Sequence, residues 1–226
     1  MNHIGFIMDG NRRYAEKLST IVTLGHKRWG DTLEAVIWYC LDAGITYASF
    51  WALSKENILE RSEKEINYIY GLLREKFPPM IERFQKGNIV FEAVGDFWIL
   101  PPDIRTILLD AIEKTDSSTP KMTVIFALGY SWQDEIVRGV KRCIAEWIDP
   151  GQLDEKTFLT YLDTGRYPPP DLIVRTGGNI RHSGYFLYQS AYSEYYFTEK
   201  LWPEFDQGEF DRTLTYYAWV KRNFWK

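Results

Sequence analysis

Two arginines follow an acid and a glycine directly after the first apolar run of the chain, in the segment Asp9-Gly10-Asn11-Arg12-Arg13. The glycine lets a ligand approach the backbone, and the N–H groups after it can face an anion. The arginines can form charge-assisted hydrogen bonds with phosphate oxygens, and Asp9 could hold a divalent cation. Asp-Gly by itself indicates a plain turn. The two arginines and the position after an apolar run favour a phosphate-binding loop, although the segment is neither a Walker A loop nor a dinucleotide fingerprint.

A second pair of arginines follows the apolar residues 172–174. Arg175 comes directly after this run, a turn of two glycines follows, and Arg181 and Ser183 come next. Two arginines on either side of a glycine turn can both bind one diphosphate. The alternative is a surface loop with incidental arginines, and the position of Arg175 beside the apolar run argues against it.

Three further polar groups have two interpretations each. The cluster Ser54-Lys55-Glu56-Asn57 follows an apolar run and is either a helix cap or part of a site. His26 stands at a predicted helix start, where it either donates to a phosphate or is structural. Glu194 lies in an aromatic stretch and is either exposed or held by a cation or an arginine.

The composition excludes several classes of protein. The chain has 226 residues, of which 45% are apolar, and this excludes disorder. It carries 27 basic and 31 acidic residues and has no basic stripe, so we expect no binding to nucleic acid. The 9 Trp, 15 Tyr and 13 Phe exceed what packing alone requires.

Cellular location can be predicted from the cysteines and the apolar runs. Cys40 and Cys143 lie on apolar faces of predicted helices, and we expect both to be buried reduced thiols in a cytoplasmic protein. Asp9 and the arginines after it interrupt the first apolar run, which argues against a signal peptide. No apolar run approaches the roughly 20 residues of a membrane-spanning helix. We expect peripheral membrane contact at most.

The segments that must position these groups alternate between strands and helices. Strands are predicted near residues 4–8, 46–53, 88–94, 121–128, 172–174 and 195–197. Helices are predicted around residues 33–41 and from Ser62, Pro101, Ser131, Asp154 and about residue 208. The pair Pro78-Pro79 should break or kink the helix that begins after Ser62.

This alternation predicts one α/β domain over residues 1–226, with a mostly parallel sheet covered by helices on both faces. Ligands of such sheets bind at the carboxyl ends of the strands. The arginines and acids should therefore converge in one crevice. They suit a diphosphate attached to an apolar group.

Several segments match one known family in order along the chain. They are HIGFIMDGNRRYAEK at 3–17, Gly25-His26-Lys27, the cluster at 54–57, Gly95-Asp96, and residues 175–183, 189–197 and 201–205. On these segments the chain resembles the cis-prenyltransferases, which include undecaprenyl and dehydrodolichyl diphosphate synthases. The resemblance implies a parallel sheet with surrounding helices, an elongated apolar tunnel and a homodimer. It also implies the condensation of an allylic prenyl diphosphate with isopentenyl diphosphate, with Mg²⁺, to form a new cis double bond.

The resemblance also implies roles for individual residues. Asp9 would hold the magnesium ion and assist ionisation, and Glu194 would complete the metal site. Asn57 corresponds to the residue assigned to proton removal. The allylic diphosphate would be bound by Gly10, Asn11, Arg12, Arg13 and His26, and the acceptor diphosphate by Arg175, Arg181 and Ser183. The remaining substrate-binding positions are Tyr14, Ser54, Lys55, Glu56 and Arg61.

The chain departs from the family pattern at five places. Val22 replaces an arginine, Ile58 replaces a tryptophan, and Asn179 replaces a glutamate. The motif arginine comes one residue late, as Arg61, and the C-terminal Arg222 lacks the glycine of the arginine-x-glycine motif that reaches the partner's site. All five differences affect diphosphate handling.

Three functional hypotheses follow. The first is a chain-elongating cis-prenyltransferase that makes a polyprenyl diphosphate for a glycosyl carrier lipid. The second is an irregular, lavandulyl-type synthase that uses dimethylallyl diphosphate as acceptor, and Asn179 motivates it. The third is a subunit of a heteromer, either non-catalytic or catalytic with the missing motif supplied by a different chain. The matched Asp9, Asn57 and Arg175 argue against a non-catalytic role.

Overall fold

One parallel sheet forms the centre of the computed structural model, which describes residues 1–18 and 22–220 and leaves out the side chains of residues 22–27. Its strands are β1 (His3–Ile7), β2 (Tyr47–Ser54), β3 (Ile89–Val94), β4 (Met122–Tyr130), β5 (Leu172–Arg175) and β6 (Glu194–Phe197). Their order across the sheet is β3-β4-β2-β1-β5-β6, and every neighbouring pair is parallel. The predicted α/β class and parallel sheet are confirmed.

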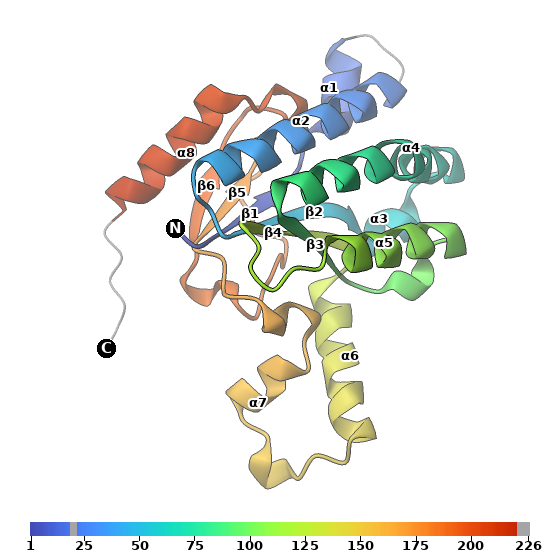
Figure 1. Cartoon of the computed structure of the whole chain (residues 1–226), viewed down its shortest axis with the longest axis vertical. Coiled ribbons are helices and arrows are strands. Elements are labelled where there is room, and N and C mark those ends of the chain that lie inside the picture. Colours follow the sequence, from blue (N-terminus) through green and yellow to red (C-terminus); the bar gives the residue numbers. More distant parts are fainter. Residues whose placement is uncertain (19–21, 221–226) are drawn as a thin grey trace.

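In the described chain α-helices follow every strand except β5 (Figure 1). They are α1 (Asn11–Lys17), α2 (Val22–Asp42), α3 (Lys55–Glu60), α4 (Glu63–Gly87), α5 (Pro102–Thr115), α6 (Trp132–Ala145), α7 (Glu155–Thr160) and α8 (Gln207–Trp219). Ser62 and Asp154 cap α4 and α7 through their side chains, as predicted. The short helix α1 was not predicted, and α3 corresponds to the helix-cap alternative for the cluster at 54–57.

The two faces of the sheet are covered differently. Side chains of β4 alternate between them, so that Val124 and Phe126 belong to the large core packed against α2, α4, α5 and α8. Ile125 faces the other way and packs with Tyr185 and Phe186. The prediction of helices on both faces was therefore only half right, because irregular segments cover much of the second face.

Many of the aromatic residues form solid core. The rings of Phe50, Phe77 and Phe91 pack around the ring of Phe126 in edge-to-face or tilted geometry. Each of these side chains is almost fully buried. Between α2 and α4 lies a partly open pocket of about 180 Å³. Its lining includes the aromatic residues Trp29, Phe77 and Phe126 and the charged residues Asp31, Glu34, Lys76 and Arg83. A longer tunnel remains a prediction.

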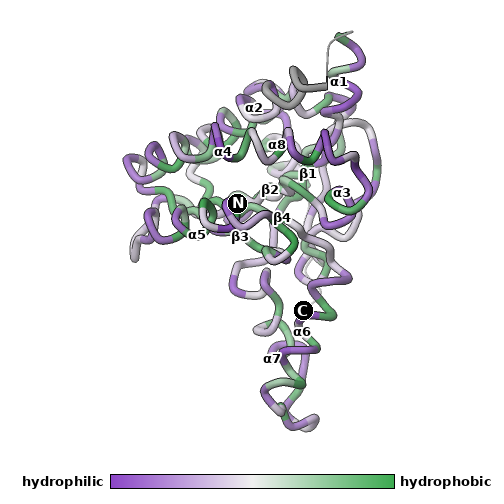
Figure 2. The backbone as a smooth tube through the Cα atoms, turned by 90° about the vertical axis from the view of Figure 1, so that its right-hand side faces the viewer, coloured by the Kyte–Doolittle hydropathy of each residue, from purple (hydrophilic) through white to green (hydrophobic). Residues whose placement is uncertain are grey.

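Helix α6 projects away from the sheet together with α7 (Figures 1 and 2). It was predicted from an apolar face that includes Val137, Val140 and Ile144, yet these side chains are 51%, 43% and 68% exposed. Glu135, Gly139 and Cys143 are the buried residues instead. Four-residue spacing places them on one stripe of the helix, so this stripe packs against the molecule and the side with Val137, Val140 and Ile144 faces outward.

The proline pair does not break α4, which continues through Pro78 and Pro79 to Gly87. Of the two predicted outcomes, a break is wrong, and a kink stays a prediction. Phe77, Met80, Ile81 and Phe84 on the same segment are buried, and their packing offsets the backbone hydrogen bonds that the prolines cannot make.

Cys40 and Cys143 are free and buried, as expected. Within residues 1–18 and 22–220, no helix has the length and apolar character needed to cross a membrane.

Candidate active site

Two cavities adjoin each other at the carboxyl ends of β1, β2 and β5. The larger, of about 450 Å³, is lined by Ile7, Met8, Asp9, Trp51, Ser54, Glu56, Asn57, Arg61, Ser131, Trp132, Arg175, Arg181 and Ser183. The smaller, of about 330 Å³, is lined by Met8, Asp9, Gly10, Asn11, Arg12, Arg13, Glu16 and Arg61. The two cavities share Met8, Asp9 and Arg61. The three polar segments of the sequence therefore converge, as predicted.

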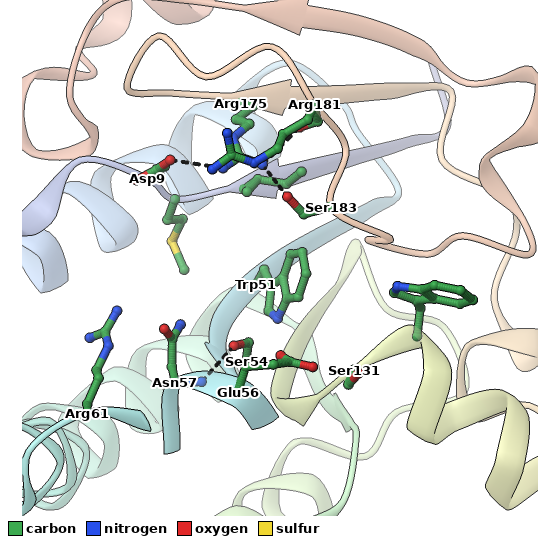
Figure 3. Close-up of a pocket in the computed structure, with 13 residues that line it drawn as sticks. Asp9, Trp51, Ser54, Glu56, Asn57, Arg61, Ser131, Arg175, Arg181 and Ser183 are labelled. Carbon is green, nitrogen blue, oxygen red and sulfur yellow. Dashed lines mark hydrogen bonds and ion pairs between the residues drawn. The ribbon is translucent and has the colours of Figure 1, made fainter. Parts of the chain in front are cut away.

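Sheet register explains the convergence. Ile7 at the end of β1 is level with Trp51 of β2 and with Arg175 of β5. The segments after these strands must therefore share one edge of the sheet. Figure 3 shows Asp9 and Arg175 on one side of the larger cavity, the residues after β2 on the other, and Trp51 between them.

Two glycines allow the loops to approach each other. Gly10 has φ 107° and Gly177 has φ 84°, both in the left-handed region. A Cβ atom at Gly10 would lie 2.8 Å from Leu201, and one at Gly177 would lie 2.6 Å from the Nη2 atom of Arg13. Arg13 also donates to the carbonyl oxygen of Gly177 at 2.6 Å. A side chain at Gly177 would displace Arg13.

Hydrogen-bond donors surround the half-buried Asp9 carboxylate. Arg175 and Asn179 donate to Oδ2 at 3.0 and 2.8 Å, and Arg13 donates to Oδ1 at 3.2 Å. Burial raises the pKa of Asp9, but the hydrogen bonds from Asn179 and Arg175 and the two arginine charges outweigh it, so the net pKa is lowered. Asp9 is therefore ionised at neutral pH and available to a cation.

Arg175 also organises the second arginine loop. Its Nη1 atom donates to the hydroxyl of Ser183 at 2.7 Å and to the carbonyl oxygen of Arg181 at 2.8 Å. Its own side chain is 6% exposed. A buried guanidinium thus holds the backbone of the loop while Arg181 itself stays exposed at the cavity.

The opposite wall begins at the end of β2. The Ser54 side chain accepts a hydrogen bond from the backbone N–H of Asn57 at 3.0 Å and caps α3. Ser54 is therefore a helix cap, and with Glu56 and Asn57 it also lines the larger cavity. The side chain of Lys55 does not line the cavity, and its ammonium group forms ion pairs with Asp96 and Asp134. The cluster at 54–57 therefore both caps α3 and contributes to the wall of the larger cavity.

Some of the anticipated residues do not line either cavity. Tyr14 and Lys55 are absent from both linings. Glu194 is level with Leu172 at the start of β5, three residues before Arg175, which at about 3.3 Å per residue is roughly 10 Å from the site edge. Within one chain the structure does not bring Glu194 to Asp9. The side chains of His26 and Val22, and the C-terminal motif at Arg222, lie outside the described residues.

Other lining residues were not anticipated. Trp51 stacks on Tyr185 with ring centroids 5.3 Å apart, and its indole N–H is buried without a partner among the described residues. Glu16, Ser131 and Trp132 complete the walls. The position of Ser131, directly after β4, was the signal that could have found it, whereas Trp51 lies inside β2.

The side-chain oxygen atoms of Asp9 and Asn11, which line the smaller cavity, are compatible with a magnesium ion. The Oδ1 atom of Asn11 is buried and has no hydrogen-bond partner in the described part of the chain. Magnesium prefers oxygen ligands and usually takes one or two carboxylates together with substrate phosphates. Among residues 1–18 and 22–220 no three His, Cys, Asp or Glu side chains form a metal cluster, so phosphate oxygens would have to supply the other ligands.

Comparison with known proteins gives consistent results along the whole chain. A family model for undecaprenyl diphosphate synthases matches residues 7–225. A tritrans,polycis-undecaprenyl-diphosphate synthase (geranylgeranyl-diphosphate specific) of Thermoplasma acidophilum is 36% identical over 98% of this chain and 88% of its own. An isoprenyl transferase of Staphylococcus haemolyticus is also 36% identical, over 98% of this chain and 88% of its own.

Two solved structures have the same fold. Lavandulyl diphosphate synthase of Lavandula x intermedia, in complex with dimethylallyl diphosphate, superposes with a TM-score of 0.93 at 28% identity, over 98% of this chain and 97% of the other. A probable undecaprenyl diphosphate synthase of Campylobacter jejuni has a TM-score of 0.82 at 29% identity, over 99% and 97%.

Proposed function

The chain belongs to the undecaprenyl diphosphate synthase family, the cis-prenyltransferases, and we propose a specific role for each of its two cavities. It is a prenyltransferase that condenses an allylic prenyl diphosphate with isopentenyl diphosphate to make a Z-polyprenyl diphosphate. The observation that carries the proposal is that two arginine-lined cavities meet at one carboxylate, Asp9.

The smaller cavity is proposed as the allylic site. Arg12 and Arg13 line it, and their guanidinium groups suit the oxygens of a diphosphate. Negative charge develops on this diphosphate as its bond to the prenyl carbon breaks. Fixed donors are most valuable at the place where such charge develops.

The larger cavity is proposed as the acceptor site. Arg181 and Ser183 would bind the diphosphate of isopentenyl diphosphate, with Arg175 holding their loop in place. The acceptor double bond would then face the allylic carbon near Asp9, since Asp9 lines both cavities. Binding the two reactants side by side removes the entropic cost of their encounter.

We propose that Asp9 and the amide oxygen of Asn11 hold a magnesium ion together with diphosphate oxygens. When bound, the ion would neutralise charge on the departing diphosphate. Asn57 faces the same cavity and is proposed to position the group that loses its proton as the new double bond forms. An amide is a very weak base, so we assign the final acceptance of that proton to a diphosphate oxygen.

The hydrocarbon part of the substrate is proposed to lie between α2 and α4. The cavity there is about 180 Å³ and its wall includes Trp29, Leu73 and Phe77. An enclosed apolar cavity of about 150 Å³ accommodates benzene. By volume the apolar part of this pocket would hold about one five-carbon unit at most, because Asp31, Glu34, Lys76 and Arg83 also line it. A longer product would require the two helices to separate.

Assembly and location are also proposals. The exposed apolar stripe of Val137, Val140 and Ile144 on α6 supports a homodimer in which this stripe packs against a second copy. Two free buried cysteines are consistent with the cytoplasm. The apolar product would favour peripheral contact with a membrane surface.

One assay separates this function from the irregular alternative, which the fold match with the lavandulyl enzyme keeps open. The purified chain is incubated with Mg²⁺ and labelled isopentenyl diphosphate plus an unlabelled allylic diphosphate, and in parallel with dimethylallyl diphosphate alone. We expect head-to-tail products with cis double bonds in the first reaction. Product formation only from dimethylallyl diphosphate would overturn the proposal, and activity only after addition of a different subunit would assign the chain to a heteromer.

A further inference from the structure

Asn179 joins two lining residues of the larger cavity, one of which is shared with the smaller cavity, although it lines neither cavity itself. Its Nδ2 atom donates to Oδ2 of Asp9 at 2.8 Å. Its Oδ1 atom accepts from Nη1 of Arg181 at 3.0 Å. The one amide thus contacts the shared carboxylate on one side and the exposed arginine of the larger cavity on the other.

The backbone before Asn179 is held firmly. Gly177 and Gly178 have φ 84° and 74°, and their N–H groups donate to the carbonyl oxygens of Lys200 and Thr198 at 2.7 and 2.9 Å. These bonds anchor the turn to the segment that follows β6. The direction of the Asn179 side chain is therefore set by the tertiary structure of the turn.

The chemistry of the amide is specific to this position. An amide supplies a donor to Asp9 and an acceptor to Arg181 at the same time. A carboxylate could accept from Arg181 but could not donate to Asp9, and it would place a second negative charge beside the first. An apolar residue could do neither.

The contact with Asn179 restricts the conformational freedom of the Arg181 side chain. Its side chain is exposed, and a free arginine loses considerable rotamer entropy when it binds an anion. The hydrogen bond to Asn179 restrains the guanidinium before substrate arrives. Restraint in advance of binding increases affinity.

We propose that Asn179 is a positioning residue that acts through both neighbours, fixing Arg181 for the acceptor diphosphate and Asp9 for the departing allylic diphosphate. This inference rests on the proposed function of the two cavities. It assigns acceptor affinity to the Oδ1 side of the amide and turnover to the Nδ2 side.

The two sides of the amide can be tested separately. Asn179→Leu removes both contacts, so we expect the KM for isopentenyl diphosphate to rise about tenfold and kcat to fall. Asn179→Asp keeps an acceptor for Arg181 but removes the donor to Asp9, so kcat should fall by about tenfold while the acceptor KM stays within about threefold. Gln152→Leu, an exposed amide-to-leucine change far from both cavities, is the matched control and should leave both constants unchanged.

The deciding experiment is a double-mutant cycle, combined with direct binding of isopentenyl diphosphate by calorimetry. If Asn179 acts through Arg181, Asn179→Leu should not weaken acceptor binding further in an Arg181→Ala background. The same loss in both backgrounds would overturn the inference, as would wild-type constants in Asn179→Leu. A wild-type protein that binds isopentenyl diphosphate with this pattern of coupling but forms no product would overturn the proposed function and leave the inference standing.

Discussion

At the residue scale, the environment of Asp9 determines what this carboxylate can do. Donors from Arg13, Arg175 and Asn179 lower its pKa despite partial burial. Asp9 also lies where the two cavities meet. Its charge is thus available at the place where, in the proposed function, the diphosphate leaves the prenyl chain.

Asp9→Ala should reduce kcat by about 10² to 10³, the scale seen when one preorganised electrostatic group is lost from a site. Steady-state turnover with saturating substrates measures the effect. Asp110→Ala, at an exposed position on α5, is the control and should retain wild-type turnover. Turnover of Asp9→Ala within a few fold of the wild type would remove this residue from the catalytic machinery.

At the scale of elements, glycine turns decide how closely the loops after β1 and β5 can approach. Gly177 combines a positive φ with a Cβ position that is 2.6 Å from Arg13. Gly71 in α4 differs, because a Cβ added there meets nothing within 4 Å. The two glycines form a matched pair for substitution by alanine.

Gly177→Ala should lower the free energy of unfolding by about 1–2 kcal/mol through backbone strain and should displace Arg13 from Asp9. We expect a lower Tm by several degrees and a raised KM for the allylic substrate. Gly71→Ala should keep or raise the Tm, because alanine favours the helix. Thermal melting and kinetics of both variants check this, and an unchanged allylic KM in Gly177→Ala would count against the role of Arg13.

His3 joins β1 to its neighbours at the end of the sheet remote from the site. Its Nδ1 atom lies 2.7 Å from the carbonyl oxygen of Pro168, so Nδ1 carries the proton, and Nε2 lies 2.8 Å from the Ser49 hydroxyl. Burial lowers the pKa of His3 from 6.5 to about 4. The unfolded chain therefore takes up a proton below pH 6.5, whereas the folded chain does so only near pH 4.

Stability should consequently fall as the pH drops from about 6.5 to 4, and His3 should contribute up to about 3 kcal/mol of that loss. Urea unfolding at several pH values measures it. His3→Asn should lack this pH-dependent contribution to stability. The difference in the free energy of unfolding between the wild type and His3→Asn should therefore shrink toward low pH. A constant difference across this range would show that His3 titrates normally.

At the scale of the whole molecule, the projecting α6 has no partner within the described chain for its apolar side. Val137, Val140 and Ile144 are exposed at helical spacing, and Trp147 just beyond them is 91% exposed. A second copy packed on this stripe would remove it from water. The stripe is therefore the place to test for the proposed dimer.

Val140→Asp combined with Ile144→Asp should convert a dimer into a monomer, because two charges would be buried in the interface. Light scattering coupled to size-exclusion chromatography measures the mass. Leu109→Asp, at an exposed apolar position on α5, should remain dimeric. A double variant that keeps the mass of two chains would place the interface elsewhere.

Sequence alone determined the alternation of strands and helices and the polar groups that follow β1, β2 and β5. These are local properties, since apolar periodicity specifies an element and the residue after a strand is found at its end. The capping of α4 by Ser62 could be predicted for the same reason, because a cap depends on neighbouring residues. The family resemblance, too, rests on short segments that can be matched without the fold.

Only the tertiary structure decided which side chains meet. Asp9 and Asn179 are 170 residues apart, yet they share a hydrogen bond because β1 and β5 are neighbours in the sheet. Lys55 is bound by two aspartates, and Glu194 lies at the other end of its strand, although both stand in matching motifs. Spacing along the chain carries no information about such contacts, because strand order, register and the packing of distant segments create them.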